Sequence, residues 1–201
     1  MLVKRALDVT ASAIGLVLLA PLFVLVAVLV ALDSPGPVFF RQTRMGQGFQ
    51  PFHIYKFRSM SHQVASQGPS VTVTGDARIT RVGHWLRRTK IDELPQLYNV
   101  LRGDMSLVGP RPEVPVYVDL YRKGYARVLQ VRPGITDPAS LRFRNEAELL
   151  SAASDPEHEY RHRILPEKLR VSAEYAEHWT LRSDIVLIWR TVLGSRHQEE
   201  P

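Results

Sequence analysis

The sequence predicts a mixed α/β fold, α+β in character, that is joined to a membrane through its first 33 residues. The first observation is a run at residues 11–32 that contains no charged side chain. The second is that short β-type segments and amphipathic helical segments follow it, separated by turn-forming residues. A chain of 201 residues is long enough for one compact domain. We therefore expect a membrane segment at residues 1–33 and a membrane-associated domain at residues 34–201.

The apolar run has about the length that spans a bilayer at roughly 1.5 Å per residue. Pro21 lies in its middle, where proline removes a backbone hydrogen bond and clashes with the preceding turn. Basic residues flank the run on both sides, so both ends favour the cytoplasm: Lys4, Arg5, Arg41 and Arg44. A re-entrant helix that breaks at Ala20 and Pro21 satisfies both constraints. One straight or kinked spanning helix is the alternative.

The composition of the chain excludes some kinds of chemistry and indicates the charge of its binding partner. The chain has no cysteine, which excludes disulfides, thiolate metal sites and cysteine nucleophiles. Its net charge of +6 requires an anionic partner: nucleic acid, an acidic membrane surface or a phosphorylated small molecule. The basic residues are dispersed and no nucleic-acid-binding motif is evident, so we do not expect nucleic acid.

Local patterns predict the remaining elements. Residues 38–40 and 52–57 are typical of short strands around a turn at 46–48, and residues 79–88 have helical spacing. Residues 61–75 are polar and glycine-bearing, which indicates a mobile loop. Further helices are expected at 155–163, opened by Asp155 and Pro156, at 166–179 and at 184–193.

The last of these predicted helices is amphipathic. Ile185, Ile188, Trp189 and Val192 share one face of it. Such a face can lie in a membrane interface or pack into an ordinary core, and the pattern favours neither.

Two adjacent carboxylates, Asp92 and Glu93, are the first chemical candidates. Leu94, Leu97, Tyr98 and Leu101 follow at helical spacing, which predicts a helix from about Asp92 to Gly103. Aspartate is a common helix cap, so the pair could be structural. Alternatively, one carboxylate attacks phosphorus while the other helps to hold Mg²⁺, because a helix N-terminus attracts anions.

Arginines beside rigid turns support the second interpretation. Arg111 lies between two prolines, Arg132 precedes Pro133, and Arg144 follows shortly after. A restricted backbone suits a guanidinium that grips phosphate in a fixed fork geometry. Each arginine alone could be a solvated surface residue, but together with the basic residues at 87–90 they predict an anion site.

A competing motif predicts zinc. His158, Glu159 and His162 match the H-E-x-x-H pattern, which would make the chain a membrane-anchored zinc hydrolase. The signal is weak, because the predicted helix is dense in charge. A third ligand is suggested only loosely by Glu174, Glu177 or His178.

Five segments in order resemble the bacterial sugar transferases, also called monotopic phosphoglycosyl transferases, in their small form that consists of the catalytic domain alone. They begin at Ser34-Pro35-Gly36-Pro37 and end at Arg132-Pro133-Gly134-Ile135-Thr136. The five segments are residues 34–42, 55–60, 92–97, 103–112 and 132–136. Several long motifs in family order are far more specific than the single zinc pattern.

The resemblance implies an enzyme at the cytoplasmic face of the bacterial inner membrane. It would transfer a sugar 1-phosphate from a UDP-sugar to a polyprenyl phosphate such as undecaprenyl phosphate, release UMP, and initiate glycoconjugate or exopolysaccharide synthesis. The resemblance further implies contact with membrane lipids, and it leaves a homodimer open. A non-catalytic partner in polysaccharide assembly remains the other alternative.

The resemblance also assigns roles to residues. Asp92 would be the nucleophile that forms a covalent aspartyl phosphosugar, and Glu93 with Asp92 would place Mg²⁺. The break of the re-entrant helix would fall at Ala20 and Pro21. The residues implied to bind substrate are Arg87, Arg111, Arg144, Lys56 and Arg58.

The sequence departs from the family pattern at two places. Residues 137–140 read Asp-Pro-Ala-Ser where many members have Gly-Trp-Ala-Gln, and Ser172 lies near the position of a common aspartate. Both places are expected to touch the substrate, so the sequence does not predict which sugar is used.

Overall fold

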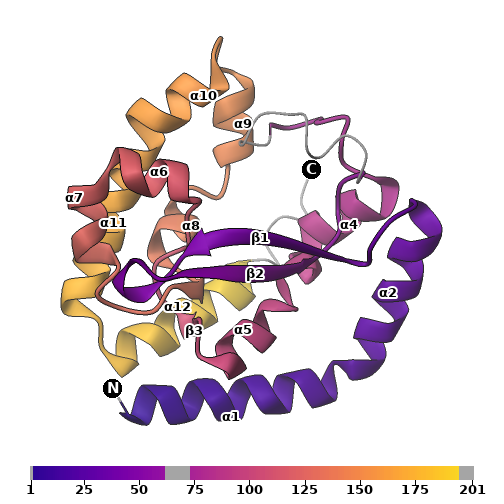
Figure 1. Cartoon of the computed structure of the whole chain (residues 1–201), viewed down its shortest axis with the longest axis horizontal. Helices are drawn as coiled ribbons and strands as arrows, with labels where there is room; N and C mark the ends of the chain where they lie inside the picture. Colours follow the sequence, from indigo (N-terminus) through magenta and orange to yellow (C-terminus); the bar gives the residue numbers. More distant parts are fainter. Residues whose placement is uncertain (1, 62–72, 195–201) are drawn as a thin grey trace.

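The computed structural model describes residues 2–61 and 73–194. The loop expected at residues 61–75 lies for the most part outside these residues. The described part consists of helices and two small sheets, as the predicted mixed α/β class requires. Figure 1 shows the sheets at the centre, with the first helix running below them and the second rising on the right.

The elements of the first half begin with two long helices and a hairpin. They are α1 (Leu2–Leu18), α2 (Ala20–Asp33), β1 (Phe39–Met45), β2 (Pro51–Phe57), α4 (Arg81–Thr89), α5 (Gln96–Arg102) and β3 (Ser106–Val108). The second half is mainly helical. It contains α6 (Pro115–Leu120), α7 (Arg122–Val128), β4 (Gly134–Thr136), α8 (Pro138–Arg142), α9 (Glu146–Ser151), α10 (Pro156–Glu159), α11 (Leu165–His178) and α12 (Leu181–Gly194). Strands β1 and β2 pair antiparallel, and β3 and β4 pair parallel.

The predicted break in the N-terminal segment is present. Helices α1 and α2 meet at Leu19 at an angle of 62°. Pro21 occupies the first turn of α2, where the missing N–H of proline is not needed. Within the described residues, no helix alone has the length and apolar character to cross a membrane. The bent pair meets both criteria together.

Helix α1 turns its polar side chains toward the rest of the protein. The guanidinium of Arg5 donates hydrogen bonds to the carbonyls of Val100 and Leu101, at 2.7 and 3.0 Å. The buried carboxylate of Asp8 accepts one from the backbone N–H of Leu107 at 3.0 Å. The opposite face of α1 is apolar and exposed: Leu7, Ile14, Val17 and Leu18. This is the reverse of an amphipathic helix in a soluble domain, so α1 presents its apolar face outward.

The hairpin forms as predicted, with Phe39 opposite Phe57 and a short 3-10 turn at Gln47–Phe49. Arg58, which was predicted to bind substrate, follows this hairpin and is buried, with 4% of its surface exposed. Its guanidinium donates hydrogen bonds to the carbonyls of Val30, Ser34 and Pro37. These bonds commit its guanidinium to the end of α2, which favours a structural role, and the substrate-binding role of Arg58 stays a prediction.

The helix predicted to begin near Asp92 begins later. Ile91–Glu93 forms a 3-10 turn, and α5 starts at Gln96 after Pro95. Asp92 is therefore not a helix cap, and the argument from a helix N-terminus does not hold for it. Gly103 ends α5 as predicted, with a φ of 101° that favours glycine.

The C-terminal helices follow the predicted pattern with one correction. Asp155 caps α10 by accepting a hydrogen bond from the N–H of His158. A π-helical turn at Tyr160–Ile164 then joins α10 to α11, so the two predicted helices form one continuous helical segment. On α12, Ile185 and Trp189 are 54% and 61% exposed, which excludes ordinary core packing for this face.

We predict that Arg58→Lys destabilises the protein without weakening nucleotide binding. Lysine keeps the charge but cannot reach three carbonyls at once, and a buried unpaired carbonyl costs about 1–3 kcal/mol. The measurement is thermal unfolding of the detergent-solubilised protein beside UMP affinity, and a lower unfolding temperature with unchanged affinity is expected. Normal stability with weakened UMP binding would return Arg58 to the substrate site.

Candidate functional site

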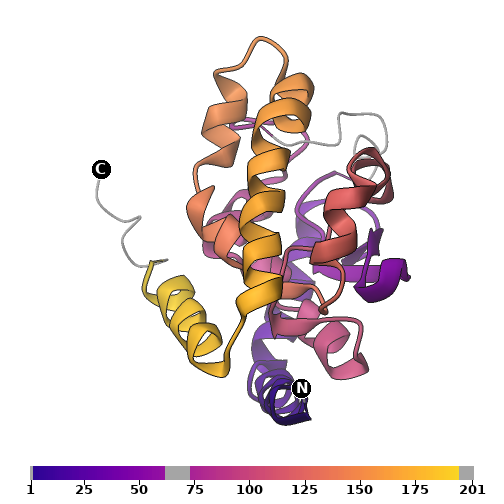
Figure 2. The same cartoon turned by 90° about the vertical axis from the view of Figure 1, so that its left-hand side faces the viewer.

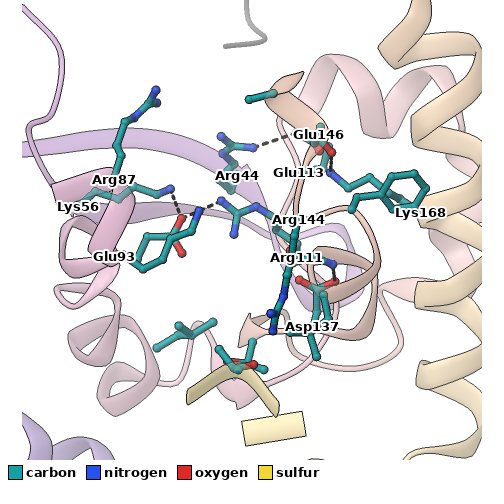
Figure 3. Close-up of a pocket in the computed structure, with 18 of the residues that line it drawn as sticks. Arg44, Lys56, Arg87, Glu93, Arg111, Glu113, Asp137, Arg144, Glu146 and Lys168 are labelled. Carbon is teal, nitrogen blue, oxygen red and sulfur yellow. Dashed lines mark hydrogen bonds and ion pairs between the residues drawn. The ribbon is translucent and has the colours of Figure 1, made fainter. Parts of the chain in front are cut away.

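A cavity of about 700 Å³ lies between the small sheets and the second-half helices. It brings together five of the predicted site residues, drawn in Figure 3: Lys56, Arg87, Glu93, Arg111 and Arg144. The lining includes eight basic side chains and four acidic ones. The basic ones are Arg44, Lys56, Arg87, Arg88, Lys90, Arg111, Arg144 and Lys168, and the acidic ones are Glu93, Glu113, Asp137 and Glu146. The cavity is therefore built for an anion.

Glu93 forms the central ion pairs of the cavity. Its Oε1 atom accepts hydrogen bonds from Lys56 Nζ at 2.7 Å and from Arg111 Nη2 at 2.8 Å. Burial alone would raise the pKa of Glu93, but Arg111 and Lys56 outweigh it and hold this pKa well below its usual value. Glu93 is therefore ionised at neutral pH.

The loop that carries Arg111 is fixed by close backbone packing. Gly109 and Gly134 approach so nearly that a Cβ atom on either would lie 2.3 or 2.0 Å from backbone atoms of the other segment. The N–H of Gly134 donates to the carbonyl of Pro110 at 2.9 Å. The segment around Arg132 therefore supports Arg111, whereas Arg132 itself is outside the cavity lining.

Asp92 lies next to Glu93 in a different environment. It is 6% exposed, and its Oδ1 atom has no hydrogen-bond partner among the described residues. Burial raises the pKa of Asp92, against the opposing attraction of Lys56. Residues adjacent in a 3-10 turn project about 120° apart, and Glu93 lines the cavity while Asp92 does not. An unpartnered buried carboxylate oxygen is costly, and such atoms are typical of functional sites.

The two carboxylates are the ligands expected for the predicted Mg²⁺. No cluster of three histidine, aspartate or glutamate side chains that could hold a metal occurs in residues 2–61 and 73–194. Mg²⁺ in phosphate-transfer sites commonly takes one or two carboxylates, with water and substrate phosphates completing its shell. The unpartnered Oδ1 of Asp92 beside Glu93 fits that donor set, although Oε1 of Glu93 already serves two cations.

The zinc alternative lacks a complete site. The rings of His158 and His162 lie 4.4 Å apart on the exposed side of their helix. Glu159 is paired with Arg163. Within the described part of the chain no third ligand joins the two histidines, and a catalytic zinc site needs three.

Arg87 and Arg144 enter the cavity from opposite walls. Arg87 lies in the last turn of α4, and its charge acts on Asp92 and Glu93. Burial lowers the pKa of Arg87, which nonetheless stays far above neutral. Arg144 follows α8, and its Nη2 atom donates to the carbonyl of Arg190 on α12 at 3.0 Å. Both guanidinium groups therefore add positive charge to the lining of the cavity.

Sequence reasoning missed the polar residues on the far wall of the cavity. Glu113 accepts hydrogen bonds from Arg44 Nη1 at 2.9 Å and from the hydroxyl of Tyr160 at 2.7 Å. Glu146 is paired with Lys168. The partners in these pairs lie tens of residues apart along the chain, so no local sequence pattern predicts the pairs.

Asp137 was noted only as a departure from the family pattern. It is fully buried, its Oδ1 atom accepts a hydrogen bond from the N–H of Ser140 at 2.8 Å, and it caps α8. Its Oδ2 atom has no hydrogen-bond partner among the described residues. Burial raises the pKa of Asp137.

We predict opposite stability effects for the two adjacent carboxylates at pH 8. The pKa of Asp92 is raised, so its ionised form costs folding free energy above that pKa, and Asp92→Asn should raise the unfolding temperature. The pKa of Glu93 is lowered, so its ionised form stabilises the protein above the ordinary carboxylate pKa, and this contribution is lost as pH falls through the folded-state pKa. Glu93→Gln should therefore lower the unfolding temperature, because Lys56 and Arg111 lose their partner.

Differential scanning fluorimetry of both variants beside the unaltered protein measures these shifts. Shifts of the same sign in the two variants would contradict the assignment of a costly charge to Asp92 and a stabilising charge to Glu93.

Comparison with known proteins identifies the family. A model of the bacterial sugar transferase family matches residues 1–197. The UDP-glucose:undecaprenyl-phosphate glucose-1-phosphate transferase of Caulobacter vibrioides is 43% identical over 195 residues, which cover 94% of this chain and 68% of that protein.

Two further relatives are longer proteins. The UDP-N-acetylgalactosamine-undecaprenyl-phosphate N-acetylgalactosaminephosphotransferase of Aeromonas hydrophila is 38% identical over 94% of this chain and 43% of its own length. A UDP-glucose:undecaprenyl-phosphate glucose-1-phosphate transferase of Escherichia coli is 37% identical over 95% of this chain and 39% of its own length. The chain thus spans less than half of these two relatives. Because the family model covers nearly the whole chain, this protein belongs to the bacterial sugar transferase family.

Proposed function

We propose that this protein transfers a sugar 1-phosphate from a UDP-sugar to undecaprenyl phosphate, with release of UMP, at the cytoplasmic face of a bacterial inner membrane. The name of the Caulobacter vibrioides relative describes this transfer, with glucose as the sugar. The observation that carries the proposal is a cavity whose described lining has eight basic and four acidic side chains, with Glu93 in its wall and the buried Asp92 next to Glu93 in the same turn. The positive excess matches the charges on a nucleotide diphosphate and a lipid phosphate.

The proposed first step uses Asp92 as the nucleophile. Its carboxylate oxygen attacks the β-phosphorus of the UDP-sugar, and the bond from this phosphorus to the bridging oxygen breaks. The bridging oxygen keeps the electron pair and leaves as part of UMP. The product is an acyl phosphate that joins Asp92 to the sugar phosphate. The unpartnered Oδ1 of Asp92 supports this role, because no hydrogen bond from the described residues stabilises the carboxylate at that oxygen and lowers its nucleophilicity.

In the second step, a phosphate oxygen of the lipid attacks the same phosphorus. The bond to Asp92 breaks, the carboxylate is regenerated, and the sugar becomes linked to the lipid through a diphosphate. One site can serve a soluble donor and a membrane-bound acceptor in turn, because the covalent intermediate separates the two visits. Neither displacement requires a side chain of the protein to take up or release a proton.

The surrounding residues bind and neutralise charge. Lys56 and Arg111 fix Glu93, and Arg87 and Arg144 bring two further guanidinium groups to the phosphates. Glu93 and Asp92 would hold Mg²⁺, which would supply neutralisation of charge on the phosphates. Within this arrangement Glu93 is held and oriented, whereas Asp92 reacts.

The outward apolar faces of α1, α2 and α12 support a monotopic membrane association. Side chains exposed on α2 include Val24, Leu25 and Leu32, and those on α12 include Trp189. A bent helix that enters and leaves one leaflet would hold the cavity near the depth of the lipid phosphate. Tryptophan and basic residues are common at that depth.

We predict that Asp92→Asn abolishes UMP release from a UDP-sugar in the absence of lipid. The unaltered protein should release up to one UMP per protein molecule under these conditions, because the first step needs no acceptor. Asparagine is not a competent nucleophile, so the burst should disappear while the variant stays folded. Asp119→Asn is the matched control, since Asp119 is an exposed carboxylate paired with Arg122 outside the cavity.

A burst of normal size from Asp92→Asn would reject Asp92 as the nucleophile. An unaltered protein that binds UDP-sugar but releases no UMP, with or without undecaprenyl phosphate, would instead favour the non-catalytic role in polysaccharide assembly.

A further inference from the structure

The charges that line the cavity are distributed unevenly. Figure 3 shows Lys56, Arg87 and Glu93 at one end, Glu113, Glu146 and Lys168 at the other, and Arg111 and Arg144 between them. Among the described residues that line the cavity, Glu93 is the one acidic side chain beside the basic residues of α4 and β2. The cavity therefore has a strongly cationic end and an end where charges are nearly balanced.

At the balanced end, Glu146 and Glu113 each have a basic partner. Glu146 on α9 is paired with Lys168 on α11, and their side chains are 27% and 13% exposed. Glu113 is paired with Arg44. The ammonium group of Lys168 also lies 5.3 Å from the centre of the Tyr160 ring. This wall therefore combines hydrogen-bonding groups with an aromatic face and carries little net charge.

Such a wall suits a neutral ring that carries hydroxyl groups. An ionised carboxylate offers about four lone-pair sites, and an ammonium group has three donors, so a pair that is already formed still has capacity for hydroxyls. Hydrogen bonds to charged groups are also stronger than those between neutral groups. Phosphates, in contrast, belong at the cationic end.

The position of this wall favours the sugar over the nucleoside. Figure 3 places Arg111 between Glu93 and this wall, and the guanidinium of Arg111 bonds Glu93 beside the proposed nucleophile. The sugar is attached directly to the phosphorus that reacts, whereas the ribose is one phosphate further away. The wall on the other side of Arg111 is therefore where we expect the sugar.

We propose that Glu146 and Lys168 form the subsite that binds the hydroxyl groups of the transferred sugar and so determine which UDP-sugar is used. This inference rests on the proposed function and adds the recognition of the sugar to it. Neither residue takes part in breaking or forming the phosphorus–oxygen bonds.

The test is a donor comparison with Glu146→Gln and Lys168→Met. For a UDP-sugar that the unaltered protein accepts, kcat/KM should fall about tenfold or more, as expected for a lost hydrogen bond to a charged group. Inhibition by UMP should not change, because UMP lacks the transferred sugar. With the 2-, 3-, 4- and 6-deoxy analogues of that donor, the penalty of each variant should vanish for the analogue that lacks the contacted hydroxyl.

Glu177→Gln is the matched control, because Glu177 is paired with Arg127 away from the cavity. Lys168→Arg is a further variant that keeps the ion pair with different donor geometry. It should alter the relative kcat/KM of UDP-glucose and UDP-N-acetylgalactosamine, and it serves if the other variants fail to fold.

Three outcomes would overturn the inference. Equal weakening of UMP and donor would assign the wall to the nucleoside, and unchanged kinetics in a folded variant would show that the wall binds no part of the donor. A penalty of equal size for every deoxy analogue would point to altered packing. All three require an active unaltered protein, so failure of the proposed function, in which that protein releases no UMP, is recognised separately.

Discussion

The double ion pair of Glu93 is the interaction on which the site depends. It joins β2 through Lys56, the 3-10 turn through Glu93, and the segment after β3 through Arg111. A buried carboxylate with one cation removed would be strongly destabilising, so the three segments are held in a single arrangement. Asp92, adjacent in the chain, is positioned by the same turn without sharing its hydrogen bonds. The structure thus separates a carboxylate that is fixed from one that is buried and unpartnered.

The N-terminal helices are part of this arrangement as well as a membrane segment. Lys4 on α1 donates a hydrogen bond to the carbonyl of Val108 at 2.9 Å and is paired with Asp184 on α12. The hydroxyl of Tyr175 on α11 donates to the same aspartate at 2.6 Å. Figure 2 shows α1 and α12 at the same end of the molecule. Since Val108 precedes the Arg111 segment, the docking of α1 contributes to the geometry of the cavity.

Local rules and the family resemblance predicted much of this from the sequence. Pro21 indicated the helix break, Gly103 the end of α5, and Asp155 the start of α10, because each acts through its own backbone. The predicted start of α5 near Asp92 was wrong. Residues Ile91–Glu93 form a 3-10 turn instead, and the α-helix begins only after Pro95. The bonds of Arg58 to the end of α2 were not predicted, because its carbonyl partners lie more than 20 residues away along the chain. The Glu146–Lys168 pair likewise joins α9 to α11 across 22 residues of chain, which no local pattern encodes.

The central claim is that Asp92 carries the sugar phosphate between the two substrates. The most direct measurement is mass spectrometry of the purified protein after brief exposure to a UDP-sugar without lipid, followed by peptide mapping. The account predicts a mass increase equal to one sugar phosphate, located on the peptide that contains Asp92 and lost when undecaprenyl phosphate is added. An adduct on another residue would contradict it, as would lipid-linked product formed in one turnover while the protein carries no adduct.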